Sequence, residues 1–142
     1  MTTYVDTSVV VSLFADDANT DRARRFALVA ESLIISDLTV AEFSSTLAIQ
    51  YRNGRATEAG VRAAFATFDH WCELVPRRVE VLSADIRGGG AIIRQLQHSL
   101  RAPDAMHLVI ARRLGVALAT FDNAMARAAP GLGIELAPLP AA

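Results

Sequence analysis

The chain has 142 residues, of which 52% are hydrophobic; this content argues against an intrinsically disordered protein and allows a buried core. The formal net charge of -1 does not indicate a nucleic-acid-binding surface, although all 14 basic residues are arginine and none is lysine. The absence of lysine excludes P-loop nucleoside triphosphatases, and the single cysteine, Cys72, excludes an intramolecular disulfide and a thiolate zinc site.

The first part of the chain predicts two strands with two helices between them. Thr3–Val5 is typical of a short strand, and Thr7–Phe14 follows as a helix whose first two residues are suited to capping it. After a polar break, a second helix extends to Ala30 with apolar residues on one face. The continuous apolar run Leu33–Ser36 predicts a strand covered on both faces.

Two longer helices are predicted next, over Leu38–Tyr51 and Thr57–Leu74, by apolar residues at helical spacing. Asn53-Gly54 ends the first of them, and the short connection predicts a helical hairpin. Near the start of the first helix, Thr39 and Glu42 stand three residues apart. This spacing fits a capping box and places Glu42 in the first helical turn.

A strand over Val79–Leu82 is followed by a predicted helix from Ser83 to about His98, which contains Gly88-Gly89-Gly90. Glycine within a helix costs roughly 1 kcal/mol relative to alanine, so we expect this helix to be broken or kinked. The glycines would then serve a bend or tight helix packing. A phosphate-binding loop is the alternative, but no strand–loop–helix context supports it.

In the last part of the chain, the sequence predicts a helix from Pro103 to Leu114 that ends at Gly115, followed by a strand over Val116–Ala119. A short helix over Asp122–Ala128 and a final strand over Ile134–Leu136 complete the predicted elements. Strands that alternate with helices predict a parallel sheet with helices on both faces. We therefore expect an α/β fold of three layers, α/β/α, with a central sheet of four or five short strands. Because the sequence has no internal repeat and no linker, residues 1–142 are expected to form a single domain.

Four acidic residues are expected at one edge of this sheet, and we call them the four acids: Asp6, Glu42, Asp104 and Asp122. Taken singly, each is a common residue at a helix start. Two of them, however, lie at or just past the carboxyl ends of strands. One is in the first turn of the helix that leaves the second strand, and one begins a helix that runs antiparallel to the strand after it. All four therefore meet at the carboxyl edge of the sheet, where open α/β sheets bind ligands.

Four carboxylates in one small site repel one another, so at neutral pH they hold protons or bind a cation. A set of oxygen ligands suits a hard ion, which we expect to be Mg²⁺, with Mn²⁺ as the alternative. Such an ion activates a water molecule and stabilises the charge on a phosphodiester during in-line displacement. The sequence leaves open whether one or two ions bind.

Four sequence blocks, in order, resemble those of the PIN-domain family, and in particular those of VapC-type ribonuclease toxins of type II toxin–antitoxin pairs. The similarity extends from Tyr4 to about Leu136, and the blocks are Tyr4–Ser8, Ser36–Phe43, Arg101–Leu108 and Leu118–Asp122. One such block arises easily by chance, whereas four in order at the expected places indicate the family. Gly88-Gly89-Gly90 departs from the pattern, because the family usually has an unbroken helix there.

The resemblance implies a PIN-like fold and a Mg²⁺-dependent endoribonuclease in which the four acids are both catalytic and metal-binding. It implies that Ser8, and with less specificity Thr120, provides a hydroxyl that orients a carboxylate or a water molecule. It also implies an RNA substrate, a homodimer and a cognate VapB-type antitoxin. That antitoxin would lay a helix into an apolar groove and reach the site with its C-terminal segment.

For other polar residues, the sequence gives less support for a functional role. Arg52, Arg55 and Arg101 could contact RNA phosphates, against a default interpretation as solvated surface arginines. His107 lies three residues after Asp104 and could assist the metal or the substrate, but packing between helices is the favoured interpretation. Asp17 and Asp85, with Asp16, Asp21 and Asp37, are interpreted as turn or capping residues, and Asn19 or Thr20 as a helix cap.

Two alternative functions remain open at this point: a PIN-like binding module without catalysis, and a metal-dependent phosphatase, which the absence of lysine disfavours. No apolar run approaches the roughly 20 residues of a membrane span. The first residues carry no basic start and no apolar signal segment, so we expect a cytoplasmic protein without membrane contact. The target RNA and the identity of the antitoxin are left open.

Overall fold

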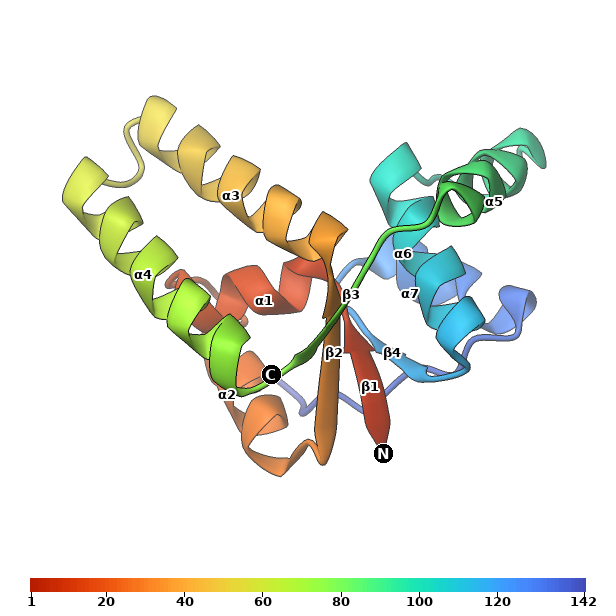
Figure 1. Cartoon of the computed structure of the whole chain (residues 1–142), viewed down its shortest axis with the longest axis horizontal. Helices are drawn as coiled ribbons and strands as arrows, with labels where there is room; N and C mark the ends of the chain where they lie inside the picture. Colours follow the sequence, from red (N-terminus) through yellow and green to blue (C-terminus); the bar gives the residue numbers. More distant parts are fainter.

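The computed structural model of the protein describes the whole chain, residues 1–142. Its centre is a parallel sheet of four strands, which lie in the order β3-β2-β1-β4. The strands are β1 (Thr2–Val5), β2 (Ser32–Ser36), β3 (Arg77–Val79) and β4 (Ala117–Ala119). The prediction of a parallel sheet with helices on both faces is therefore confirmed (Figure 1).

Seven α-helices and a short 3₁₀-helix surround the sheet. They are α1 (Thr7–Phe14), α2 (Thr20–Val29), α3 (Asp37–Arg52), α4 (Glu58–Leu74), α5 (Ser83–Arg94), α6 (Ala102–Leu114), α7 (Asn123–Ala128) and the 3₁₀-helix Pro130–Leu132. In Figure 1, the α3–α4 hairpin lies on one side of the sheet, and α5 and α6 lie on the other. No helix is both long and apolar enough to cross a membrane.

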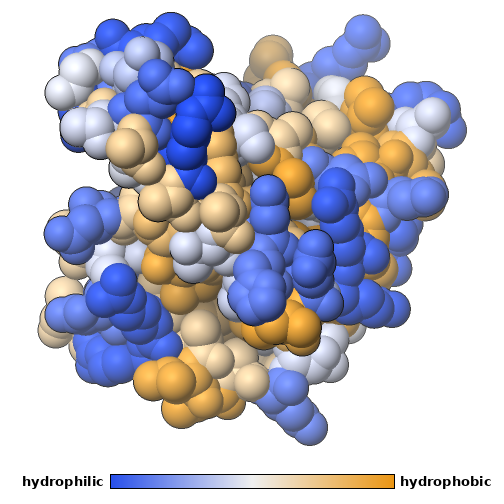
Figure 2. All heavy atoms as spheres, turned by 60° about the vertical axis from the view of Figure 1, so that its left-hand side comes forward, coloured by the Kyte–Doolittle hydropathy of each residue, from blue (hydrophilic) through white to orange (hydrophobic).

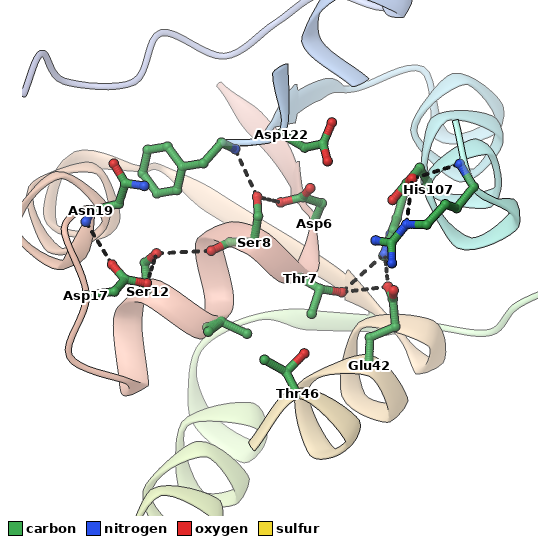
Figure 3. Close-up of a pocket in the computed structure, with 14 residues that line it drawn as sticks. Asp6, Thr7, Ser8, Ser12, Asp17, Asn19, Glu42, Thr46, His107 and Asp122 are labelled. Carbon is green, nitrogen blue, oxygen red and sulfur yellow. Dashed lines mark hydrogen bonds and ion pairs between the residues drawn. The ribbon is translucent and has the colours of Figure 1, made fainter. Parts of the chain in front are cut away.

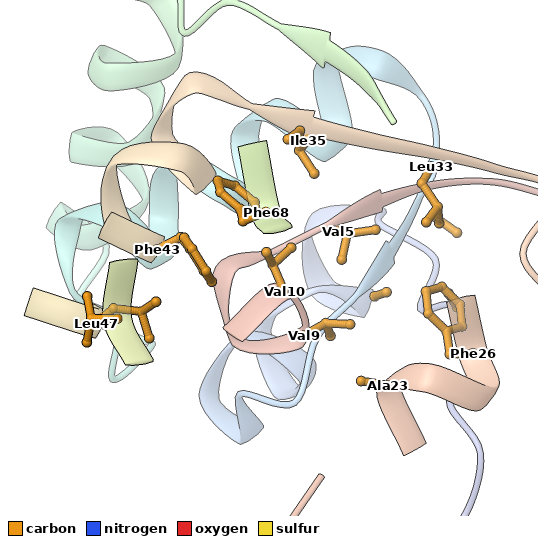
Figure 4. Packing of buried hydrophobic residues seen from close by; sticks show 14 residues of the cluster. Val5, Val9, Val10, Ala23, Phe26, Leu33, Ile35, Phe43, Leu47 and Phe68 are labelled. Carbon is orange, nitrogen blue, oxygen red and sulfur yellow. The ribbon is translucent and has the colours of Figure 1, made fainter. Parts of the chain in front are cut away.

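The two faces of the sheet are buried in two separate clusters because successive strand residues point to opposite sides. Val5 and Ile35 face a cluster built with α1, α2 and the α3–α4 hairpin (Figure 4). Tyr4, Ile34 and Leu118 face a second cluster built with α6 and α7. Because both faces of the sheet are covered, its central strands are continuously apolar. The strand predicted from the run Leu33–Ser36 is therefore confirmed.

Two strand predictions were wrong. The third strand lies at Arg77–Val79, so Glu80–Leu82 falls outside the strand that we expected there. The predicted final strand is also absent, since Ile134–Leu136 contributes only an isolated bridge between Leu136 and Leu118. Both segments lie at sheet edges, where short strands limit unwanted pairing with other chains.

The α5 helix is unbroken from Ser83 to Arg94, so the expected break at the glycines is absent, and the helix ends before His98. A Cβ on Gly88 would lie 3.1 Å from Val109 Cγ1, and a Cβ on Gly89 would lie 3.1 Å from Met106 Cγ. Both contacts are with α6. Two of the three glycines therefore permit close packing of α5 on α6, whereas Gly90 meets only open space.

The capping of α3 differs from the prediction in a way that affects Glu42. The capping box is formed by Ser36 and Thr39, because α3 begins at Asp37. Glu42 therefore lies beyond the first turn and takes no part in capping. Its carboxylate is free to pair with side chains of other elements.

Candidate active site

All four acids line one cavity of about 440 Å³ at the carboxyl edge of the sheet. Asp6 directly follows β1, and its backbone amide donates to Ala119 O of β4 at 3.2 Å. Asp122 caps α7 after β4, Glu42 lies on α3 after β2, and Asp104 lies in the first turn of α6. Residues from four different parts of the chain thus meet at one place, as the parallel topology predicts.

Asp6 is the most deeply buried of the four acids, with 3% of its surface exposed. Its Oδ1 accepts a hydrogen bond from the Ser8 hydroxyl at 2.6 Å, and its Oδ2 accepts one from the Thr120 hydroxyl at 2.7 Å. Burial raises the pKa of Asp6 above its ordinary value, although the nearby His107 and these two hydroxyls act in the opposite direction. A cation in the cavity would favour the ionised carboxylate.

Ser8 and Thr120 also connect the two strands beneath the cavity. Ser8 Oγ accepts the backbone amide of Phe121 at 2.9 Å, and Thr120 Oγ1 accepts that of Asp122 at 2.9 Å. Each hydroxyl therefore joins Asp6 to the segment that follows β4. The position of Asp122 relative to Asp6 depends on these two small side chains.

Glu42 is held by a buried histidine (Figure 3). The Oε1 atom of Glu42 lies 2.5 Å from His107 Nε2 and accepts the Thr7 hydroxyl at 2.8 Å. Because a carboxylate oxygen only accepts, His107 Nε2 is the donor in this contact. Burial alone would raise the pKa of Glu42, but the hydrogen bond and charge of His107, the hydrogen bond of Thr7 and the charge of Arg101 outweigh burial and lower it.

The other side of His107 leads into the core. Its Nδ1 lies 2.7 Å from the Tyr4 hydroxyl, which in turn lies 2.8 Å from Ser36 Oγ. Burial raises the pKa of Tyr4 far above its usual range, so this phenol stays protonated. His107 is thus clamped between a carboxylate in the cavity and a phenol in the core. The packing interpretation missed this contact, although the position of His107 one helical turn after Asp104 pointed to the cavity.

Three of the acids leave one oxygen without a protein partner. Asp104 uses Oδ2 to accept the backbone amide of Arg101 at 2.9 Å, and Asp122 uses Oδ1 to accept that of Met125 at 2.9 Å. Glu42 uses Oε1 alone. Each of these three acids therefore uses one carboxylate oxygen to cap a helix or to pair with protein side chains. Its second oxygen remains available to a ligand.

The donor set fits a hard cation in its chemistry, because every candidate ligand is a carboxylate oxygen at one cavity. No three His, Cys, Asp or Glu side chains, however, lie close enough together to hold an ion in this arrangement. Mg²⁺ commonly binds through one or two carboxylates and keeps several waters. The four acids satisfy that requirement without closing to a compact cage.

The structure separates the three predicted RNA-binding arginines. Arg101 lines the cavity and lies 3.4 Å from Asp104 through its Nε, with 79% of its side chain exposed. Arg52 ends α3 and Arg55 lies in the turn that follows, so both are at the tip of the hairpin and outside the cavity. The cavity instead includes polar residues that sequence reasoning assigned to turns, caps or nothing: Ser12, Asp17, Asn19 and Thr46.

Comparison with known proteins gives the family and the fold of the chain. The PIN domain family model matches residues 3–130. Ribonuclease VapC46 of Mycobacterium tuberculosis is 33% identical over 136 residues, which cover 94% of each chain. Among solved structures, the sarcin-ricin-loop-cleaving toxin VapC20 of Mycobacterium tuberculosis matches with a TM-score of 0.72 and 22% identity, over 89% of this chain and 94% of that one. VapBC2 of Rickettsia felis, bound to a DNA fragment from its promoter, matches with a TM-score of 0.68 and 13% identity over 96% and 98%.

Proposed function

We propose, from the premise that this chain belongs to the PIN-domain family and to its VapC-type ribonuclease toxins, that it is a Mg²⁺-dependent endoribonuclease. The observation that carries the metal dependence is the meeting of the four acids at one cavity, three of them with an oxygen that no protein group uses. Mn²⁺ is the alternative ion, since it accepts the same oxygen ligands.

In this proposal, the four acids would hold the ion, directly or through its water molecules, and the ion would supply an activated water molecule and a positive charge beside the scissile phosphate. Ser8 and Thr120 keep Asp6 in place through their hydroxyl groups. His107 and Thr7 orient Glu42 and hold one of its oxygens away from the ligand. Arg101, at the rim, offers a guanidinium group to an RNA phosphate.

We further propose a VapB-type antitoxin as the partner of this chain and a homodimer as its assembly. Both proposals rest on the VapC type of the chain and on the likeness to VapBC2. The PIN domain is proposed to occupy the whole of residues 1–142, beyond the 3–130 that match the family model. A location in the cytoplasm stays a prediction.

The function is tested by Asp6→Asn and Asp104→Asn, assayed for cleavage of single-stranded RNA with and without Mg²⁺. Both substitutions preserve size and remove a negative charge from the cavity. We expect the variants to be folded and to lose Mg²⁺-dependent cleavage, while Asp69→Asn, an exposed acid on α4, cuts as fast as the unmodified chain. Cleavage at an unchanged rate by both cavity variants would contradict the proposal.

A binding module without catalysis is the second candidate, and one observation favours it: no three ligands are close enough to hold an ion. Calorimetry separates the two functions. Binding of Mn²⁺ that disappears in Asp104→Asn supports the nuclease, whereas absence of Mn²⁺ binding in the millimolar range supports the module. The remaining alternative, a phosphatase, requires turnover of a chromogenic phosphomonoester and indifference to RNA.

A further inference from the structure

The cavity extends beyond the four acids into a part that is lined by other polar residues and an aromatic ring. Figure 3 shows Ser12, Asp17 and Asn19 on the side away from Glu42 and His107, with Asp6 between the two groups. We call Ser12, Asp17, Asn19 and Phe121 the outer arm of the cavity. The function described above assigns no role to any of these residues.

Phe121 supplies an aromatic surface in the outer arm. Only two of the 14 residues that line the cavity are hydrophobic, and they are Phe121 and Val11. The ring is only partly buried, and it belongs to the residue directly before Asp122. The backbone amide of Phe121 donates to Ser8 Oγ at 2.9 Å, and the same oxygen donates to Asp6 at 2.6 Å. The backbone of Phe121 is therefore tied to Asp6 through Ser8.

Arg22 of α2 supports the ring from outside the cavity. Its guanidinium carbon lies 4.8 Å from the centroid of the Phe121 ring, although Arg22 does not line the cavity. The guanidinium group is itself fixed, because Arg22 donates to Asn19 Oδ1 at 2.9 Å and to Pro140 O at 2.7 Å. A cation placed over one face of a ring holds that ring in place. The ring also packs against the buried cluster built with α1 and α2, and it lines the cavity as well.

Polar groups stand beside this surface. Asp17 accepts hydrogen bonds from the Ser12 hydroxyl at 2.8 Å and from the Asn19 backbone amide at 2.7 Å, which fix its carboxylate. Arg22 occupies the Asn19 side-chain oxygen, whereas the side-chain nitrogen of Asn19 donates to no group in the structure. The outer arm thus offers a fixed acceptor and a free donor next to an aromatic ring.

We propose that the outer arm binds one nucleobase of a single-stranded RNA, next to the phosphodiester held at the four acids. In this site Phe121 is the stacking surface, and Asp17 and Asn19 face the edge of the base. An aromatic ring accepts the flat face of any base, while a carboxylate at the edge favours bases with N–H groups there. The inference rests on the proposed nuclease function and extends it to substrate binding.

The test measures binding of a short single-stranded RNA, with all variants made in the Asp104→Asn chain so that the RNA stays intact. Phe121→Leu removes the ring and keeps an apolar side chain of similar volume. Phe65→Leu is the matched control, because Phe65 is also partly buried but lies on α4 outside the cavity. Phe121→Tyr retains the stacking surface and serves as the rescue variant.

We expect Phe121→Leu to weaken RNA binding roughly tenfold, within the range measured for a single base stacked on an aromatic side chain. Phe65→Leu and Phe121→Tyr should bind as the parent does. A 2-aminopurine base placed along the RNA should be quenched at one position, and that quenching should disappear with Phe121→Leu. An abasic RNA at the same position should bind equally weakly to both chains, because the ring and the base form one interaction.

Equal affinity of the parent and Phe121→Leu for RNA, with equal quenching, would overturn the base site and leave the nuclease function intact. Equal losses with Phe121→Leu and Phe65→Leu would also overturn it, since the ring would then act only through packing. If the parent chain bound no RNA and the unmodified chain cut none, the nuclease function itself would fail.

Discussion

Arg113 of α6 donates two hydrogen bonds of 2.8 Å, one to each carboxylate oxygen of Asp85 on α5. Asp85 is completely buried, and it also accepts the backbone amide of Leu82 at 2.8 Å. The capping role predicted for Asp85 is therefore only part of its function. The same carboxylate ties α5 to α6, the helix that carries Asp104 and His107.

Arg113→Gln should destabilise the protein by about 3 kcal/mol, because it leaves a buried carboxylate without its charged partner. Urea unfolding followed by circular dichroism measures this loss. Arg112→Gln is the matched control: the residue is adjacent, exposed and unpaired, so its effect should stay within about 0.5 kcal/mol. Similar unfolding midpoints for the two variants would contradict the role of the pair.

The same pair predicts a dependence of stability on pH. Burial alone raises the pKa of Asp85, but the hydrogen bonds from Arg113 and Leu82 and the charge of Arg113 outweigh burial, so the folded pKa lies below the ordinary value. The stabilisation is then fully present above the unfolded pKa of about 4 and is lost as the pH falls through the lower folded pKa. The difference in unfolding free energy between the unmodified chain and Asp85→Asn should therefore shrink below about pH 4. A difference that stays constant down to pH 2 would argue against this assignment.

Two neighbouring glycines of α5 should respond to alanine in opposite directions. A Cβ on Gly89 would lie 3.1 Å from Met106 Cγ and 3.3 Å from Met106 N, whereas a Cβ on Gly90 meets nothing. Gly89→Ala should lower the unfolding free energy by about 1 kcal/mol or more through overpacking. Gly90→Ala should raise it by about 0.5–1 kcal/mol, because alanine is the better helix former. Thermal unfolding measures both effects, and a Gly89→Ala variant as stable as Gly90→Ala would show that α5–α6 packing does not need Gly89.

His107→Gln should raise the Mg²⁺ concentration needed for RNA cleavage by about 10- to 100-fold, as for groups that orient a metal ligand. A glutamine side chain cannot hydrogen bond to Glu42 and to the Tyr4 hydroxyl in the way that the imidazole ring does. Titration of cleavage with Mg²⁺ measures the shift. His70→Gln, on the exposed side of α4, provides the control and should leave the Mg²⁺ requirement unchanged. If the two variants needed the same Mg²⁺ concentration, His107 would act only in packing.

The sequence alone was sufficient for the architecture and for the meeting of the four acids. The run Leu33–Ser36 and the helical spacing of α3 and α4 are local patterns, which chain neighbours determine through burial and backbone conformation. Parallel connectivity then places the carboxyl ends of β1, β2 and β4 at one edge. No contact between distant side chains had to be known to bring Asp6 and Asp122 together.

Only the tertiary structure decided which groups those acids contact. Glu42 was expected in a capping box with Thr39, but it pairs with His107, a residue 65 positions away along the chain. The outer arm likewise joins Asp17 and Asn19 to Phe121, and the glycines of α5 became intelligible only against Met106 and Val109. Periodicity records which face of an element is buried. It carries no information about which partner covers that face, because the partner is selected by packing between elements that are distant in sequence.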